Sequence, residues 1–276
     1  MEWALDNIDF LRDNQYILYI EMKQRTWCIL EISVLKKAAE RLTVTGRHKK
    51  MISKSVVLLC KENVWSSHAI DLAKCFFGDS LTIYRGNFGD EFPIDLRTNS
   101  YNILISFLSP WIIPEDILEK SEIAINFHPG SRNYPGYGCY NFALYEESRF
   151  YGCVCHHMGK KVDTGKIIFE ETFEINKNET VESLKLRTMV IMLSLFHRTI
   201  SMLAEEIPLP VADINWSRRP FTRKELLELC EINIDMDFDE IKKRIRAVTY
   251  PGYPGAELKI GGIKFVSEVP VRKPLA

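Results

Sequence analysis

The chain has no long apolar run, no paired cysteine spacing and no leader-like start, and each absence argues against a class of protein. The run Met189–Leu193 is far too short to span a bilayer, so no membrane partner is expected. The start Met1–Asp6 has neither a basic region nor an apolar core. Seven cysteines, an odd number, argue against a disulfide scaffold. We therefore expect a cytoplasmic protein in a reducing compartment.

Glycine is missing where a dinucleotide-binding protein needs it. The first expected strand, Ser55–Lys61, continues into Glu62-Asn63-Val64-Trp65, with no glycine that would let a pyrophosphate approach the backbone. This argues against NAD and FAD. Cys153-x-Cys155 followed by two histidines invites a zinc site, but adjacent histidines on a strand point to opposite faces, so no metal is expected.

The sequence does contain an alternation of apolar strand-like runs and helical spacings, which implies a mostly parallel sheet with right-handed crossovers. The expected strands are Ser55–Lys61, Ser80–Tyr84, Tyr101–Leu108, Ile123–His128, Tyr151–Met158 and Ile167–Ile175. The expected helices are Trp65–Phe77, Pro114–Lys120 with proline at its first position, Tyr140–Glu147 and the mostly buried Val181–Glu205. The predicted fold class is α/β, with a Rossmann-like, mostly parallel twisted sheet flanked by helices.

One constellation between Ile123 and Ile168 carries chemistry. An apolar strand runs into Asn126-Phe127-His128-Pro129, and Asp163 follows in a later loop. Because strand residues i and i+2 point to one face, the Asn126 and His128 side chains project the same way where the strand ends. Proline stops further ladder pairing at that point. Side chains at the carboxyl end of a parallel strand face the crevice in which α/β sheets bind ligands.

These residue types are the parts needed to move an acyl group onto an amine. His128 can take or give a proton near neutral pH. Asn126 has an amide N–H for a developing oxyanion. Asp163 can fix the tautomer of the imidazole and raise its basicity. Each residue alone also has a structural explanation, since Asn and Asp beside proline or glycine commonly form turns. The combination therefore predicts the catalytic trio.

A longer pattern surrounds the trio. Asn-x-His-Pro at 126–129 is followed by Gly152 and His156, and then by Val162-Asp163-x-Gly165-x-Ile167. This pattern resembles the folate-dependent formyltransferases, which include glycinamide ribonucleotide formyltransferase, methionyl-tRNA formyltransferase and the nucleotide-sugar N-formyltransferases. The resemblance covers roughly residues 55–205. It implies 10-formyltetrahydrofolate as the formyl donor and the trio Asn126, His128 and Asp163 as the catalytic residues.

The resemblance also implies where the folate binds. In relatives the pterin lies against the segment that ends the third expected strand. A flat heteroaromatic ring needs an apolar slot with backbone donors and acceptors, and this segment can supply both. The expected folate contacts are Phe107, Leu108, Ser109, Trp111 and Ile112, together with Val162 and Gly165.

The acceptor is where the chain departs from the tRNA enzymes of the family. Those enzymes carry Ser-Leu-Leu-Pro after His-Pro and append a basic domain, whereas this chain has the run 130–138 and an acidic balance. From residue 55 onward, 26 Lys and Arg face 30 Asp and Glu. Such a surface gains little from counterion release on a polyphosphate. Nucleic acid is therefore not an expected partner.

The tyrosine-rich run after His128 and the tail 246–256 look most like the nucleotide-sugar N-formyltransferases. Those enzymes formylate an amino-deoxysugar attached to dTDP, UDP or GDP, usually for a bacterial surface polysaccharide. An indole beside guanidiniums, as at 216–219, can stack a base or sugar and pair with phosphates. The expected substrate contacts are Tyr134, Tyr137, Trp216, Arg218, Arg246 and Tyr250. A homodimer is implied by the same resemblance.

Three segments are expected along the chain. Residues 55–205 form the catalytic domain. Residues 206–276 form a small extension for substrate or dimer contacts, with a helix at Asp237–Thr249 and a tight hairpin of Ala256–Ile260 and Ile263–Val266. Residues 1–54 do not fit the family. In that segment Tyr16–Met22 and Trp27–Val34 suggest strands and Leu35–Leu42 a helix, and translation starting at Met51 is the alternative.

Three other functions remain open at this point. The same trio can hydrolyse 10-formyltetrahydrofolate with water in place of an amine. The acceptor can be another amine, such as that of methionyl-tRNA. A folate-binding role without catalysis is the third, although nothing in the trio is degraded.

Overall fold

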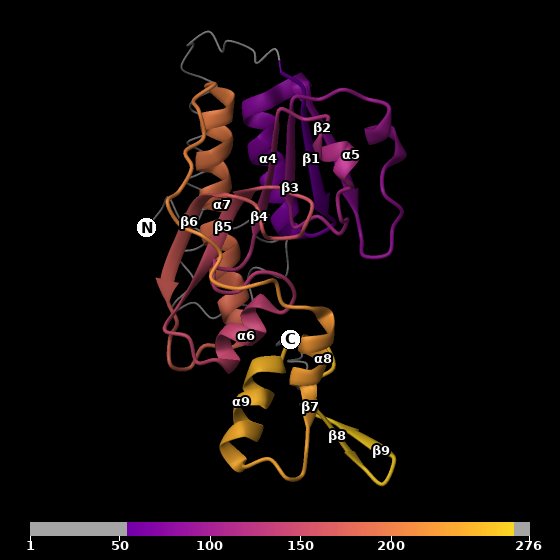
Figure 1. Cartoon of the computed structure of the whole chain (residues 1–276), viewed down its shortest axis with the longest axis vertical. Coiled ribbons are helices and arrows are strands. Elements are labelled where there is room, and N and C mark those ends of the chain that lie inside the picture. The colour runs from indigo at the N-terminus through magenta and orange to yellow at the C-terminus, as the bar shows by residue number, and fades with distance from the viewer. Residues whose placement is uncertain (1–53, 268–276) are drawn as a thin grey trace, which may run out of the picture.

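A six-stranded sheet forms the centre of the protein, in the strand order β2-β1-β3-β4-β5-β6 (Figure 1). The structure is a computed structural model and describes residues 54–267. The strands are β1 Val56–Lys61, β2 Leu81–Gly86, β3 Ile103–Phe107, β4 Ile123–His128, β5 Phe150–His157 and β6 Ile167–Glu174. Each expected strand is found, with its ends shifted by at most two residues. The elements expected before residue 54, and the alternative start at Met51, lie outside the described residues.

The sheet is parallel on one side and antiparallel on the other. β1 pairs in parallel with both β2 and β3, and β3 pairs in parallel with β4. β5 pairs antiparallel with both β4 and β6. The loop 158–166 between β5 and β6 contains no helix, and a parallel pair needs a longer crossover connection. The predicted Rossmann-like, mostly parallel sheet is confirmed. The alternation of strands and helices in the sequence did not predict its antiparallel side.

Helices cover both faces of the sheet because the strand residues that point to either face are mostly apolar. On one face, α4 (Val64–Phe77) and α7 (Val181–Ala204) pack over inward-facing residues of β1, β3, β4 and β5. The other face is covered by the short helices η2 (Ile94–Arg97) and α5 (Glu115–Leu118). By length and composition alone α7 is apolar enough to cross a membrane, but 56% of that stretch is buried inside the protein.

Helix starts follow the capping residues in the sequence. Asn63 accepts a hydrogen bond from the Ser66 N–H at the start of α4, and Thr180 forms a capping box with Ser183 at the start of α7. The expected helix Pro114–Lys120 is shorter than predicted. Pro114 has an extended ψ of 152° and caps α5 rather than forming its first residue. The fixed φ of proline suits either position, so the sequence did not separate them.

The C-terminal part lies beyond one end of the sheet, beneath α6 (Cys139–Tyr145), as Figure 1 shows. It comprises α8 Arg223–Cys230, α9 Phe238–Val248 and a small sheet of β7 Glu231–Ile232, β8 Glu257–Ile260 and β9 Ile263–Val266. The predicted α9 and the β8–β9 hairpin are present. Gly261 and Gly262 have positive φ angles of 58° and 81°, as a tight hairpin turn requires. α8 was not predicted, although Thr222 and Glu225 form a capping box at its start.

Candidate active site

The strand β4 brings Asn126 and His128 to one face, as the alternation predicts. Asn126 pairs with His156 of the neighbouring antiparallel strand β5. The Asn126 Nδ2 atom lies 3.2 Å from the His156 Nε2 atom. Ladder pairing in β4 ends at His128, directly before Pro129. Two histidines and an amide therefore gather where β4 ends.

Asp163 completes this group from the loop between β5 and β6. Its Oδ2 atom lies 3.1 Å from His128 Nδ1. Its Oδ1 atom lies 3.3 Å from His156 Nε2 and 3.4 Å from Asn126 Nδ2. The structure thus brings the predicted trio together, with His156 as a fourth member. The sequence pattern contained His156 but gave it no role.

The carboxylate of Asp163 is buried, with 5% of the residue exposed. Burial raises the pKa of this carboxyl, but the nearby His128 ring and the hydrogen bond with His156 outweigh it. The Gly136 N–H also donates to Oδ2, at 2.9 Å. The pKa of Asp163 consequently lies well below its ordinary value, and the group is a carboxylate at neutral pH.

Both ring nitrogens of His128 face acceptors. Nδ1 faces Asp163, and Nε2 lies 2.8 Å from the backbone carbonyl oxygen of Tyr134. A neutral imidazole has only one N–H, so both contacts are hydrogen bonds only when the ring carries two protons. For His128 to exchange a proton with a ligand, one of these two contacts has to open.

Close backbone approaches explain two glycines near the trio. A Cβ atom on Gly165 would overlap the carbonyl oxygen of His157, so only glycine lets the Asp163 loop lie against β5. A Cβ atom on Gly130 would lie 2.7 Å from the Tyr134 carbonyl oxygen and closer still to His128 Nε2. Asp163 itself has a φ of 48°, in the left-handed region that aspartate tolerates better than most residues.

Trp216 forms one wall of the site. Its ring lies edge-on to both histidines, with centroid distances of 5.8 Å to His128 and 5.2 Å to His156. Its indole N–H donates to the Gly165 carbonyl oxygen at 2.8 Å. The half-buried ring was predicted as a substrate contact, and the structure does place it beside the trio.

The residues predicted to contact folate lie in different surroundings. Phe107 is fully buried against Phe127 and Phe196, so its side chain has no exposed surface for a pterin. Leu108 directly follows β3 with a φ of 54°, a strained value for leucine. The Ser109 hydroxyl accepts a hydrogen bond from the backbone N–H of Trp111, and the Trp111 indole N–H donates to the Asp90 carbonyl oxygen. Of the remaining predicted contacts, Ile112 and Val162 are exposed, and Gly165 lies at the trio.

The predicted substrate residues fall into two groups. Tyr134 is buried and Tyr137 is exposed, both in the loop after His128. Arg218 forms a bidentate ion pair with Glu146, at 2.6 and 3.1 Å, and its guanidinium lies over the Tyr134 ring. These residues and Trp216 belong to the surroundings of the trio.

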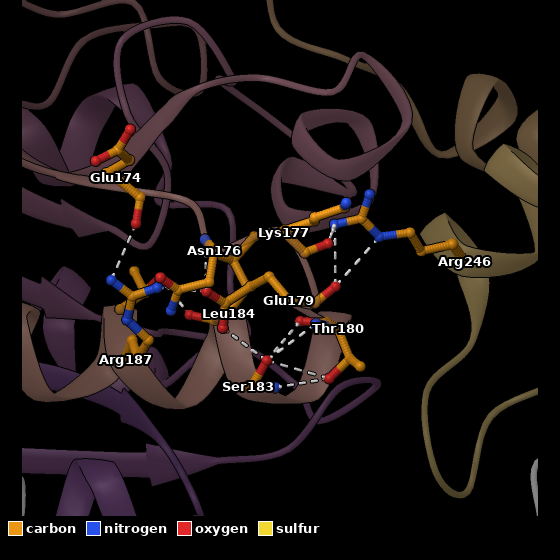
Figure 2. Close-up of polar contacts among 10 residues, drawn as sticks. Glu174, Asn176, Lys177, Glu179, Thr180, Ser183, Leu184, Arg187 and Arg246 are labelled. Atoms are coloured by element: carbon orange, nitrogen blue, oxygen red, sulfur yellow. Dashed lines mark hydrogen bonds and ion pairs between the residues drawn. The ribbon is translucent and has the colours of Figure 1, made fainter. Parts of the chain in front are cut away.

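Arg246 and Tyr250 belong to a different contact. The Arg246 guanidinium donates to the carbonyl oxygens of Glu179 and Lys177, at 3.2 and 3.3 Å, which joins α9 to the start of α7 (Figure 2). The Tyr250 hydroxyl accepts from Lys185 of α7 at 2.8 Å. The structure shows no contact between these two residues and the trio, and it gives them a role in holding the C-terminal part.

Within residues 54–267 no group of three or more His, Cys, Asp or Glu is arranged to hold a metal ion. Of the residues considered for zinc, Cys153 and Cys155 are buried in the core, and burial raises the pKa of Cys155 to about 12.

The segment that carries the trio is similar to known proteins. Residues 89–200, which include the whole trio, match the sequence model of a family described as formyl transferase. A methionyl-tRNA formyltransferase from Prochlorococcus marinus (strain MIT 9312) is 25% identical over an alignment of 185 residues, and the match covers 63% of this chain and 56% of that protein. The chain thus spans little more than half the length of this curated relative.

Solved structures extend the likeness beyond the matched segment. A sugar N-formyltransferase from Shewanella sp. FDAARGOS_354 has a TM-score of 0.65 at 17% identity, over 78% of this chain and 97% of that chain. An N-formyltransferase from Helicobacter canadensis, in complex with folinic acid and dTDP-3-aminofucose, has a TM-score of 0.61 at 19% identity, over 75% and 84%. At these identities the likeness shows the fold. Together with the family match over residues 89–200, it confirms the predicted resemblance to the folate-dependent formyltransferases.

Proposed function

We propose that the protein transfers the formyl group of 10-formyltetrahydrofolate to the amine of a nucleotide-linked amino-deoxysugar. The observation that carries the proposal is the buried Asp163 carboxylate, which contacts His128, His156 and Asn126 inside the segment that matches the formyl transferase family. A buried carboxylate that orients an imidazole beside an amide donor is suited to acyl transfer.

The proposed reaction needs one proton relay and one oxyanion donor. The neutral amine nitrogen bonds to the formyl carbon, and the carbonyl electron pair moves onto oxygen. Asn126 donates its amide N–H to that oxygen. The tetrahedral species then collapses, the bond between the formyl carbon and the folate nitrogen breaks, and the amine proton passes through His128 to the leaving nitrogen. Asp163 holds the ring and balances the charge of the imidazolium.

His128 can pass a proton through Nε2 only if the contact between Nε2 and the Tyr134 carbonyl oxygen opens, because that contact otherwise occupies the nitrogen. The loop after His128 has an unused polar group: the Ser131 hydroxyl is buried and finds no hydrogen-bond partner among the described residues. Buried polar groups in folded proteins normally have a partner. A free hydroxyl three residues from His128 therefore fits a loop that binds a polar ligand.

The choice of a sugar acceptor is supported by three observations. The solved sugar N-formyltransferase is covered over almost its whole length, 97%. A structural neighbour was solved with a folate and a dTDP-amino sugar, which supports these two ligand classes for this chain. The chain from residue 55 onward has more acidic than basic residues, which disfavours a polyanion. We further propose a homodimer that acts in the cytoplasm in the biosynthesis of a surface polysaccharide.

The test is a screen of dTDP-, UDP- and GDP-linked amino-deoxysugars with 10-formyltetrahydrofolate, read by mass spectrometry for the gain of one formyl group. Formylation of a sugar by the wild type, lost in His128→Ala and kept in His197→Ala, is the expected result. His197 is a matched control because it is a half-buried histidine on α7, packed against Phe76. Formate release without an amine would show a hydrolase instead. Formylation of methionyl-tRNA alone would refute the sugar acceptor.

A further inference from the structure

Two loops meet at the trio, and no strand pairing joins them to each other. His128 is the last residue of β4 and is followed by the loop 129–138, whereas Asp163 lies in the loop 158–166 between β5 and β6. The 3.1 Å contact between His128 and Asp163 holds only while the loop 158–166 keeps its position against the end of β4 and against the loop 129–138, whose Gly136 N–H donates to Asp163. A displacement of about 1 Å in an active site can reduce the rate on the order of 10²-fold. Whatever joins the two loops therefore matters for catalysis.

A third stretch of chain, the 216–221 segment, runs along the loop after His128. The Ser217 N–H donates to the Arg132 carbonyl oxygen at 3.1 Å. The Phe221 N–H donates to the Pro135 carbonyl oxygen at 2.9 Å, and the Phe221 carbonyl accepts from the Tyr137 N–H at 3.0 Å. These three backbone bonds attach the 216–221 segment along the length of that loop.

The approach at its far end is close enough to require glycine. A Cβ atom on Gly136 would lie 2.7 Å from the Phe221 nitrogen, and Gly136 has a φ of 86°. Gly136 is also the residue whose N–H donates to Asp163. The backbone that pairs with the 216–221 segment is thus the same backbone that helps to hold the catalytic carboxylate.

Trp216 connects the 216–221 segment to the loop 158–166, which contains Asp163. Its indole N–H bonds to the carbonyl oxygen of Gly165, two residues after Asp163, and its ring lies against both histidines. The two guanidiniums that follow are engaged on either side, Arg218 with Glu146 and Arg219 with Glu225. The indole is therefore held in place by its own hydrogen bond and by a segment attached on both sides.

We infer that Trp216 is a positioning residue for formyl transfer, which ties the His128 loop to the Asp163 loop and keeps both imidazoles in place. This rests on the proposed function for its kinetic consequence. It also replaces the expectation that Trp216 stacks on the acceptor. A stacking residue acts mainly on substrate binding, whereas a positioning residue acts on turnover at saturating substrate.

The kinetic test compares Trp216→Leu and Trp216→Phe with the wild type in the formyl-transfer assay. Trp216→Leu loses the ring and the indole N–H, and kcat should fall on the order of 10²-fold with both KM values within threefold. Trp216→Phe keeps a ring beside the histidines but loses one hydrogen bond, so kcat should fall about 3- to 10-fold. A KM for the acceptor raised tenfold or more, with kcat unchanged, would show stacking and overturn the inference.

A second measurement does not need an acceptor. The imidazole NMR signals of His128 and His156 should shift in Trp216→Leu, because the indole ring lies edge-on to both, while the His197 signals stay. Phe76→Leu is the matched control, because Phe76 lies edge-on to His197 at 5.4 Å, and it should shift His197 alone. If Trp216→Leu does not fold, both the kinetic and the NMR comparison are made with Trp216→Phe alone, for which smaller changes in the same quantities are expected.

The two failures are distinguishable. If no acceptor is formylated, the proposed function fails, and the line widths of the NMR signals decide whether Trp216 holds the imidazoles: loss of the indole ring shifts both signals in any case, whereas only loosened imidazoles broaden them. If the His128 and His156 signals keep their line widths in the folded Trp216 variants, the inference is wrong even for an active formyltransferase.

Discussion

Replacing Gly130 by alanine tests the His128 arrangement with a single methyl group. That methyl would lie 2.7 Å from the Tyr134 carbonyl oxygen, where ordinary contacts of a Cβ atom begin at 3.4 Å. The carbonyl, which is backbone, or the methyl must therefore move by at least 0.3 Å to reach the 3.0 Å below which Cβ contacts are essentially never seen, and by 0.7 Å to reach an ordinary contact. The methyl would be closer still to His128 Nε2, so the imidazole has to move as well.

Gly130→Ala should change both the folding free energy and the turnover. Overpacking a buried position costs about 1–3 kcal/mol of folding free energy. Displacing the imidazole lengthens its contact with Asp163, now 3.1 Å, and a displacement near 1 Å reduces turnover on the order of 10²-fold. A hundredfold loss corresponds to about 2.7 kcal/mol of transition-state stabilisation.

The assay is formyl transfer at saturating substrates, with urea unfolding measured in parallel. Gly159→Ala is the matched control, because a Cβ atom there has no neighbour within 4 Å and its φ is not positive. The control should be active and stable to within experimental error. A folded Gly130→Ala variant with turnover within threefold of the wild type would refute the proposed position of the imidazole.

Three further predictions concern the trio and the contact that Arg246 makes. Asn126→Ala should lower turnover about 10²–10³-fold without unfolding the protein, as loss of an oxyanion donor does, and near-normal turnover would remove that role. The pKa of Asp163 is depressed in the folded state, so its stabilisation is present above the unfolded pKa near 4 and lost as pH falls through the folded pKa. Melting curves should therefore show the advantage of wild type over Asp163→Asn shrinking below about pH 4, and an advantage independent of pH would contradict this. Arg246→Ala should lower unfolding free energy by about 1–3 kcal/mol while leaving acceptor KM unchanged, with exposed Lys242→Ala as control; a raised KM would restore Arg246 as a substrate residue.

Most of the sheet could be predicted because its signal is local. Apolar runs bounded by polar residues locate each strand, and helical spacing locates α4 and α7. The direction of β5 could not be predicted in this way. The connection from β4 to β5 contains α6, as a parallel crossover would, although the two strands are antiparallel. The helix-free loop from β5 to β6 indicates only that these two strands run antiparallel.

The trio was predictable for a different reason. The alternation rule places Asn126 and His128 on one face, and the family resemblance supplies Asp163. No local rule indicates that the Asp163 loop folds back to within 3.1 Å of His128, because that depends on tertiary packing. The left-handed φ of Asp163 and the absent side chain at Gly165 are the local features that permit it.

Contacts from the C-terminal part were the hardest to predict. Arg246 and Trp216 both resemble ligand-binding residues in sequence, because a guanidinium and an indole serve ligands and backbone carbonyls equally well. The structure separates them: Arg246 donates to carbonyls of the residues just before α7, and Trp216 donates to the carbonyl of Gly165 (Figure 2 shows the former). The sequence shows which side chains can donate hydrogen bonds, but only the fold shows which groups accept them.

The same reasoning explains why glycine recurs in the two catalytic loops. A histidine whose two nitrogens both face acceptors is held rigidly, and rigidity at this point needs close backbone approach on several sides. Gly130, Gly136 and Gly165 each lie where a Cβ atom would meet another group at less than 3.0 Å. A side chain at any of the three would separate surfaces that the catalytic contact requires to touch. These three positions therefore require glycine because the backbone is close-packed there, and substitutions at them should reduce turnover more steeply than they reduce stability.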